Sequence, residues 1–221
     1  MKLKYKIWLG VGLVIAWFLR SFFPFMFFND DGVEVILNVP DNTVPNLHAT
    51  YRSSDCQHIN LYDFSLRDAK KSGRIEWEKV TENQYRTIVN YYDNSLCRWG
   101  LRSLGWSLDY IDASKVDPRA TSGGGGGVLI RIEPRSTTIW GEPLGGLSGK
   151  YFEDEVLTLN QVLLPEVNNR AIGYVKGDYE VYIGAEKKLP DIYFNPFKHR
   201  DTARIEYTAT IDYDRLTDVS E

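Results

Sequence analysis

Residues 204–213 read RIEYTATIDY, a run in which apolar side chains recur at every second position. Successive side chains on a β-strand point to opposite faces, so this pattern predicts a strand with one buried and one exposed face. The same alternation recurs at residues 33–39, 59–64 and 179–183. We therefore expect an exported domain made mainly of short strands.

The predicted fold class is all-β, an antiparallel β-sandwich, with an α+β layout as the alternative. The content of 14 Tyr and 6 Trp suits such a core. Residues 99–110 carry apolar side chains in two phases, which predicts a β-bulge near Ser103. Residues 65–71, ended by Gly73, are the best place for a short helix.

The glycine run at residues 123–127 follows Thr121 and Ser122. Five consecutive glycines have no preferred conformation, so this segment is expected to be a loop or a linker. As a linker it would divide residues 29–221 into two small β-domains near 121–127. As a hairpin loop it would lie within a single sandwich, and the sequence leaves both readings open.

The N-terminus indicates where the chain is located. Lys2, Lys4 and Lys6 precede an apolar region from Ile7 to Phe28, 22 residues that are interrupted by Arg20. About 20 apolar residues span a bilayer, and basic residues before the span favour a cytoplasmic N-terminus. Residues 1–28 are thus predicted to be a cytoplasmic stub and a transmembrane anchor.

An uncleaved anchor is favoured over a cleaved signal peptide, because the small residues of a cleavage site are scarce after Ala16. Cleavage remains the alternative. The expected location is the bacterial inner membrane, crossed once through residues 7–28, with the β-rich domain 29–221 in the periplasm.

The exported part has a net charge of −8, because four of the 26 basic residues and none of the 30 acidic ones lie in residues 1–28. Nucleic-acid binding depends on cationic clusters, so a nucleic-acid partner is not expected. The same balance disfavours adhesion to anionic lipid headgroups. A cationic protein is the more natural partner.

Cys56 and Cys97 are the two cysteines of the chain. An even number of cysteines in an exported domain favours a disulfide. Two alternatives remain open, namely a pair of buried free thiols and a metal site formed with His48 and His58. Zinc sites usually show paired Cys-x-x-Cys spacing, which is absent, so no metal or cofactor is predicted.

No motif of the sequence specifies a catalytic activity, and we do not expect an enzyme. The predicted function is a membrane-tethered periplasmic binding protein, an immunity-type inhibitor that neutralises an exported antibacterial toxin such as a lipase or wall hydrolase. The alternatives are an envelope assembly, scaffold or sensing subunit, and a small periplasmic hydrolase that uses His58 with Asp55.

Aromatic side chains are common anchors of protein interfaces. Those beside glycine-rich turns are least needed for a core, so Trp140, Tyr151 and Phe152 are the candidate contacts for a protein partner, including a cognate toxin.

Overall fold

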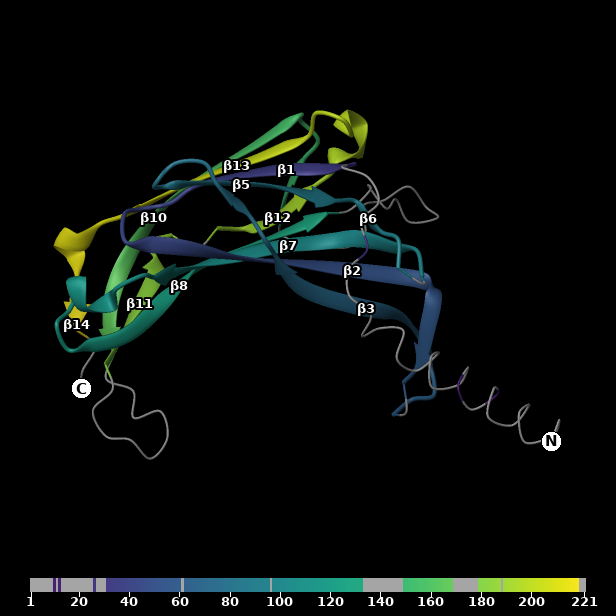
Figure 1. Cartoon of the computed structure of the whole chain (residues 1–221), viewed down its shortest axis with the longest axis horizontal. Coiled ribbons are helices and arrows are strands. Elements are labelled where there is room, and N and C mark those ends of the chain that lie inside the picture. Colours follow the sequence, from purple (N-terminus) through teal and green to yellow (C-terminus); the bar gives the residue numbers. More distant parts are fainter. Residues whose placement is uncertain are drawn as a thin grey trace.

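The computed structural model describes residues 31–60, 62–95, 97–132, 149–168, 179–187 and 189–218, together with Gly10, Gly12 and Met26. From residue 31 onward these residues form strands and short 3-10 turns, with no α-helix among them, so the all-β prediction is confirmed. Figure 1 shows the strands as a strongly curled sheet.

The strands and 3-10 turns are, in chain order, β1 (Gly32–Asn38), β2 (Thr43–Ile59), β3 (Leu66–Ile75), β4 (Glu78–Lys79), β5 (Gln84–Asn90), β6 (Tyr92–Asp93), β7 (Trp99–Tyr110), η2 (Ala113–Lys115), β8 (Ala120–Ile132), β9 (Gly149–Phe152), β10 (Val156–Asn168), β11 (Tyr179–Ala185), β12 (Asp191–Phe194), η3 (Pro196–His199), β13 (Arg204–Ile211), η4 (Tyr213–Arg215) and β14 (Thr217–Asp218).

All of the described strands belong to one sheet, whose main path runs β3-β2-β7-β8-β11-β10-β13-β1-β5-β4. This differs from the predicted antiparallel sandwich, because the sheet is continuous and mixed. Strand β13 pairs in parallel with both β1 and β10, and β8 pairs in parallel with β11 and β12. Alternation along one strand indicates burial on one face, but it does not indicate the direction of the neighbouring strand.

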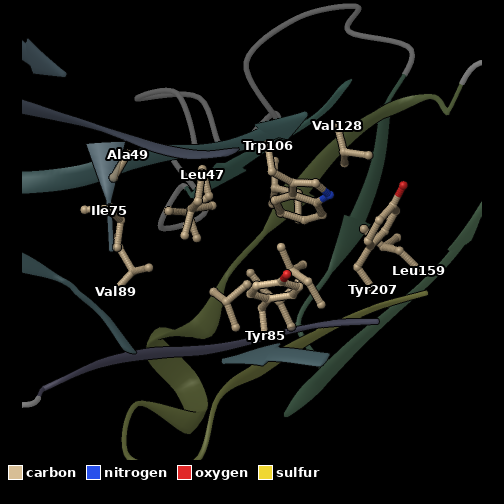
Figure 2. Close-up of a cluster of buried hydrophobic side chains, with 14 of the residues drawn as sticks. Leu47, Ala49, Ile75, Tyr85, Val89, Trp106, Val128, Leu159 and Tyr207 are labelled. Carbon is tan, nitrogen blue, oxygen red and sulfur yellow. The ribbon is translucent and has the colours of Figure 1, made fainter. Parts of the chain in front are cut away.

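The core lies inside the curl. In Figure 1, β13, β1 and β5 lie above β7, β2 and β3, so the two ends of the sheet face each other. The predicted strand at the C-terminus supplies one wall, since Ile205 and Tyr207 of β13 are fully buried. Figure 2 shows buried side chains from opposite walls, such as Leu47 of β2 and Tyr85 of β5, pointing into the same space.

The bulge predicted near Ser103 is present. Thr50 of β2 lies opposite Ser103, whereas the next residue, Tyr51, lies opposite Leu101, which leaves Arg102 without a counterpart. The extra residue changes which side chains face inward, so Leu101 and Leu104 are both buried.

The predicted helix at residues 65–71 is wrong, because Leu66–Ile75 forms strand β3 and pairs with β2. Helix-forming residues are frequent in this segment, but their pattern of burial has a period of two: Ala69, Lys71 and, further along, Ile75 are buried. Pairing with β2 overrides the local preference.

The glycine run is neither a loop nor a linker. It lies within β8, which pairs with β7 from the first half of the chain and with β11 from the second. The close approach of these neighbours explains the composition: a Cβ atom at Gly123 would lie 2.2 Å from the carbonyl oxygen of Val181, and one at Gly125 would lie 2.5 Å from that of Ile183. Side chains would keep the strands apart.

Within the described part of the chain, no helix is long and apolar enough to cross a membrane. The predicted anchor at residues 7–28 lies outside the described residues, apart from Gly10, Gly12 and Met26.

Candidate functional site

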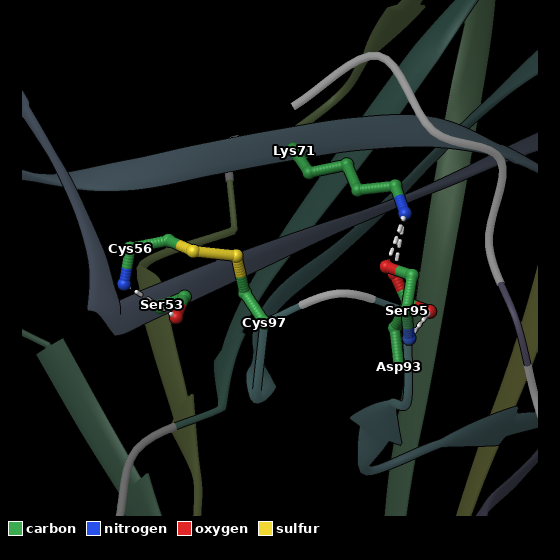
Figure 3. The surroundings of a disulfide bond; sticks show 6 residues. All are labelled: Ser53, Cys56, Lys71, Asp93, Ser95 and Cys97. Atoms are coloured by element: carbon green, nitrogen blue, oxygen red, sulfur yellow. Dashed lines mark hydrogen bonds and ion pairs between the residues drawn. A yellow bond between two sulfur atoms is a disulfide. The ribbon is translucent and has the colours of Figure 1, made fainter. Parts of the chain in front are cut away.

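A buried ion pair joins β3 to β6 (Figure 3). Lys71 Nζ lies 2.5 Å from Asp93 Oδ2, and the two side chains are only 6% and 0% exposed. Lys71 Nζ also donates to Ser95 Oγ at 3.1 Å, and Ser95 Oγ donates to Asp93 Oδ2 at 3.0 Å. Backbone amides of Ser95 and Met26 donate to Asp93 Oδ1, so the carboxylate is well supplied with donors.

Serine beside lysine is a combination that some hydrolases use for nucleophilic catalysis. Here the side chains of Ser95 and Lys71 are both buried. The cluster instead fixes neighbouring strands. Tyr51 of β2 is close enough to feel the charge of Asp93, and its hydroxyl donates to the Asn90 carbonyl at 2.8 Å. Burial, and secondly the charge of Asp93, raise the pKa of Tyr51 well above its ordinary value.

The two cysteines lie beside this cluster at disulfide distance, with their Cα atoms 6.0 Å apart. Cys56 lies where the pairing of β2 with β3 is interrupted between Ser53 and Gln57, and its amide donates to Ser53 Oγ at 3.2 Å. Cys97 lies just before β7. A bond across 41 residues stabilises the fold by roughly 4 kcal/mol in the chain-entropy description.

The outer face of β5, β1 and β13 carries a row of charges. Glu34 of β1 accepts from Arg86 Nε of β5 at 2.5 Å and from Arg204 Nε of β13 at 2.6 Å. The hydrogen bond to Glu34 is the main cause that raises the pKa of Arg204 above its ordinary value. Arg204 also lies 3.4 Å from Glu206. One carboxylate thus holds two guanidinium groups in place across three adjacent strands.

A groove of about 370 Å³ opens at this row, at the Gly32 end of β1. Its lining includes the Glu34–Arg86–Arg204 group and two further acidic residues, Glu155 and Asp201, both exposed. Ile88 and Val156 add aliphatic surface and are 44% and 39% exposed.

The groove has more negative than positive side chains. Both arginines of its lining are paired with Glu34, whereas no ion pair to Glu155 or Asp201 is present among the described residues. The unmatched charge is therefore negative and lies beside aliphatic side chains. Such a surface suits a cationic side chain with an apolar stem, as arginine and lysine have.

Two of the predicted partner contacts are described, and they face opposite ways. Tyr151 of β9 is 50% exposed and stacks on Tyr193 of β12, with ring centroids 4.7 Å apart. Its neighbour Phe152 packs against the core. Adjacent residues of a strand point to opposite faces, so Tyr151 lies on the exposed side of β9 and Phe152 on the side toward the core. Trp140 lies outside the described residues.

Two of the predicted alternatives involve histidine: a hydrolase that uses His58 with Asp55, and a metal site formed by the cysteines with His48 and His58. Asp55 is exposed on β2, and the side chain of His58 lies outside the described residues. The described residues contain no group of three His, Cys, Asp or Glu that could hold a metal ion, and the two cysteines lie at disulfide distance from each other.

A second hollow of about 240 Å³ lies beside β8, β11 and β12, lined mainly by aliphatic residues such as Val128 and Leu189. Its buried polar group, Gln161, already accepts a hydrogen bond from Tyr207 at 2.9 Å. This hollow therefore offers few polar groups for recognising a ligand.

Sequence analysis missed the Lys71–Asp93 pair and the groove. Lys71 and Asp93 are 22 positions apart in the sequence with no motif that links them, and Lys71 lay in a predicted helix. Alternation does predict that Glu34, Arg204 and Glu206 face outward, but the parallel pairing that brings β1 beside β13 has no local signal.

Comparison with known proteins gives no relative: no family model, curated protein or solved structure matches the chain.

Proposed function

We propose that this chain is a membrane-tethered binding protein of the bacterial periplasm, an immunity-type inhibitor that neutralises an exported antibacterial toxin such as a lipase or wall hydrolase. The observation that carries the proposal is the groove across β5, β1 and β13, with its unmatched Glu155 and Asp201 beside Ile88 and Val156.

Rigidity makes this groove suitable for binding a protein. Strand β1 is hydrogen-bonded to β5 on one side and to β13 on the other. Glu34 is held by two arginines before any partner arrives. A surface that is already ordered loses little conformational entropy on association, so more of the contact energy appears as affinity.

The negative charge of the groove favours a partner with a cationic surface. The exported part has a net charge of −8, and the groove concentrates two unpaired carboxylates. We propose that a lysine or arginine of the toxin enters between Glu155 and Asp201, while its aliphatic stem lies against Ile88 and Val156. Residues 7–28 would tether the inhibitor at the inner membrane, on the route of a toxin that enters the periplasm.

Charge reversal tests the proposal. If a neighbouring gene encodes the proposed toxin, the double variant E155K/D201K should abolish protection of cells against it and should weaken its binding to the purified full-length chain. Each new lysine would face the proposed cation across the groove, and like charges repel. The matched control is E82K/D214K, which changes the net charge equally at two exposed residues outside the groove lining.

Both variants should keep the near-ultraviolet circular dichroism of the wild type. Equal protection by E155K/D201K and the wild type would remove the groove from the interface. If the wild-type chain binds no neighbouring gene product and instead co-purifies with several membrane proteins, the assembly alternative replaces the inhibitor.

A further inference from the structure

The tip of the β2–β3 hairpin exposes large apolar side chains. Ile59 is 53% exposed, Leu66 is 65%, Tyr62 is 95% and Phe64 is 80%. Ile59 and Leu66 are partners on the last rung of the hairpin, and Tyr62 and Phe64 lie in the turn between them. Four such side chains at one end of a hairpin form an apolar patch that a free surface rarely carries.

The turn is built by its own hydrogen bonds. The Asn60 amide donates to the Ser65 carbonyl at 2.8 Å, and Asp63 Oδ1 accepts from both the amide and the hydroxyl of Ser65. Arg67 pairs with Asp63 at 2.7 Å. Phe64 has a φ of 52°, the left-handed region that side chains rarely adopt. These polar groups thus bond to one another within the turn, while the side chains of Tyr62 and Phe64 are exposed.

The tip extends from the end of the sheet where Met26 is bound. The Met26 amide donates to Asp93 Oδ1 at 2.7 Å, and the Met26 carbonyl accepts from the Asn94 amide at 2.8 Å. Asp93 is paired with Lys71 of β3, so Met26 is fixed at the base of the hairpin. Beyond this point β2 bends, and the hairpin continues away from the rest of the sheet (Figure 1).

We propose that this tip inserts into the periplasmic interface of the phospholipid bilayer that residues 7–28 span. The inference rests on the proposed tether, because Met26 lies two residues before the end of the predicted anchor. Tyrosine and other amphipathic or apolar side chains are favoured at the boundary between headgroups and acyl chains. The exposed Tyr62 and Phe64, flanked by Ile59 and Leu66, provide these groups.

Tethering explains why a small patch is sufficient. A second contact on an already anchored chain forms within one molecule, at a high effective concentration, so a weak intrinsic affinity still keeps the tip in the interface. Asp63 and Arg67 neutralise each other, so apolar contact drives insertion, and zwitterionic lipid is enough. Two membrane contacts would fix the orientation of the domain, and with it that of the groove.

Depth-dependent quenching tests the proposal on the full chain. The variant Tyr62→Cys is labelled with a thiol-reactive fluorophore, while Cys56 and Cys97 are held as a disulfide, and the protein is reconstituted into phosphatidylcholine vesicles with or without brominated acyl chains. The matched control carries the label at Ile111, which is 65% exposed and follows the far end of β7. Bromine should reduce emission from position 62 and leave position 111 unchanged.

A second variant removes the supporting side chains. In Ile59→Ser/Leu66→Ser, the label at position 62 should lose its quenching by bromine although the chain still floats with the vesicles. If the chain floats and brominated lipid leaves the emission from position 62 as unchanged as that from position 111, the tip proposal is overturned and the tether stays intact. A chain that does not float at all overturns the tether, and the tip proposal fails with it.

Discussion

Burying an ion pair in the wall of a β-sheet costs desolvation free energy, which Lys71 and Asp93 offset with a dense set of contacts. Lys71 also lies 5.7 Å from the centroid of the Trp99 ring, a cation–π distance. Removing one member of such a pair leaves the other charge without compensation in a medium that solvates it poorly. The pair is therefore sensitive to single substitutions and more tolerant of paired ones.

We expect Lys71→Met to lower the free energy of unfolding by about 3–5 kcal/mol, the range for breaking a buried pair from one side. The double variant Lys71→Met/Asp93→Asn should lose much less, because no uncompensated charge remains and the amide oxygen can still accept from Met26 and Ser95. Denaturant titration of both variants measures the difference. A Lys71→Met protein as stable as the wild type would contradict this account of the cluster.

At the scale of single residues, the sequence was informative where chemistry is tied to composition. The even number of cysteines, Cys56 and Cys97, predicted a pair at disulfide distance without any knowledge of the fold. The Lys71–Asp93 pair could not be predicted, because it depends on the placement of β3 beside β2 and of β6 beside β7. Alternation places Glu34 on an outer face, but only the parallel neighbour β13 brings Arg204 to it.

At the scale of elements, the glycine run shows how composition can mislead. Free of context, five glycines are expected to be mobile, whereas in β8 they allow backbones on both sides to approach closely. Two of them, Gly125 and Gly126, have φ values of 148° and 62°, which side chains rarely adopt. Strand β3 is the complementary case, because its local preference for helix yields to pairing with β2.

Alanine substitution distinguishes the glycines that the sheet requires from those it tolerates. Gly125→Ala should lower the free energy of unfolding by about 2 kcal/mol or more, since it combines a strained φ with a Cβ 2.5 Å from the Ile183 carbonyl oxygen. At Gly127 the nearest atom would be the Trp106 carbonyl oxygen at 3.7 Å.

Gly127→Ala is therefore the matched control, expected to change stability by no more than about 1 kcal/mol, with a gain from the reduced entropy of the unfolded chain. Thermal or denaturant unfolding of the two variants side by side gives the comparison. Equal losses at both positions would mean that the register of β8 differs from the one described.

At the scale of the whole molecule, strands from distant parts of the sequence alternate in the sheet. Strand β1 lies between β13 and β5, and β8 lies between β7 and β11. Such pairing depends on contacts between residues far apart in the chain, so the sequence pattern predicted the class of the fold but not its path. It also means that residues before and after the glycine run contribute to one hydrophobic core.

Four core tyrosines allow the shared hydrophobic core to be tested by alkaline unfolding. Burial is the main cause that raises the pKa of Tyr51, Tyr91, Tyr110 and Tyr207 above the ordinary value. A raised pKa in the folded state means that the folded protein keeps protons which the unfolded chain releases above about pH 10. The stabilisation is fully present below that pH and is lost as the pH rises toward the folded-state pKa.

Each such tyrosine should steepen the loss of stability by up to about 1.4 kcal/mol per pH unit above about pH 10. Three of the four precede the glycine run and Tyr207 follows it, so a shared core predicts one alkaline transition in which tyrosinate absorbance and circular dichroism change together. Tyr207→Phe should reduce the slope by the share of one residue and cost about 1 kcal/mol at neutral pH, since the hydrogen bond to Gln161 is lost. Two separated transitions, with only the later or the earlier one altered by Tyr207→Phe, would instead show that the chain unfolds as two independent units.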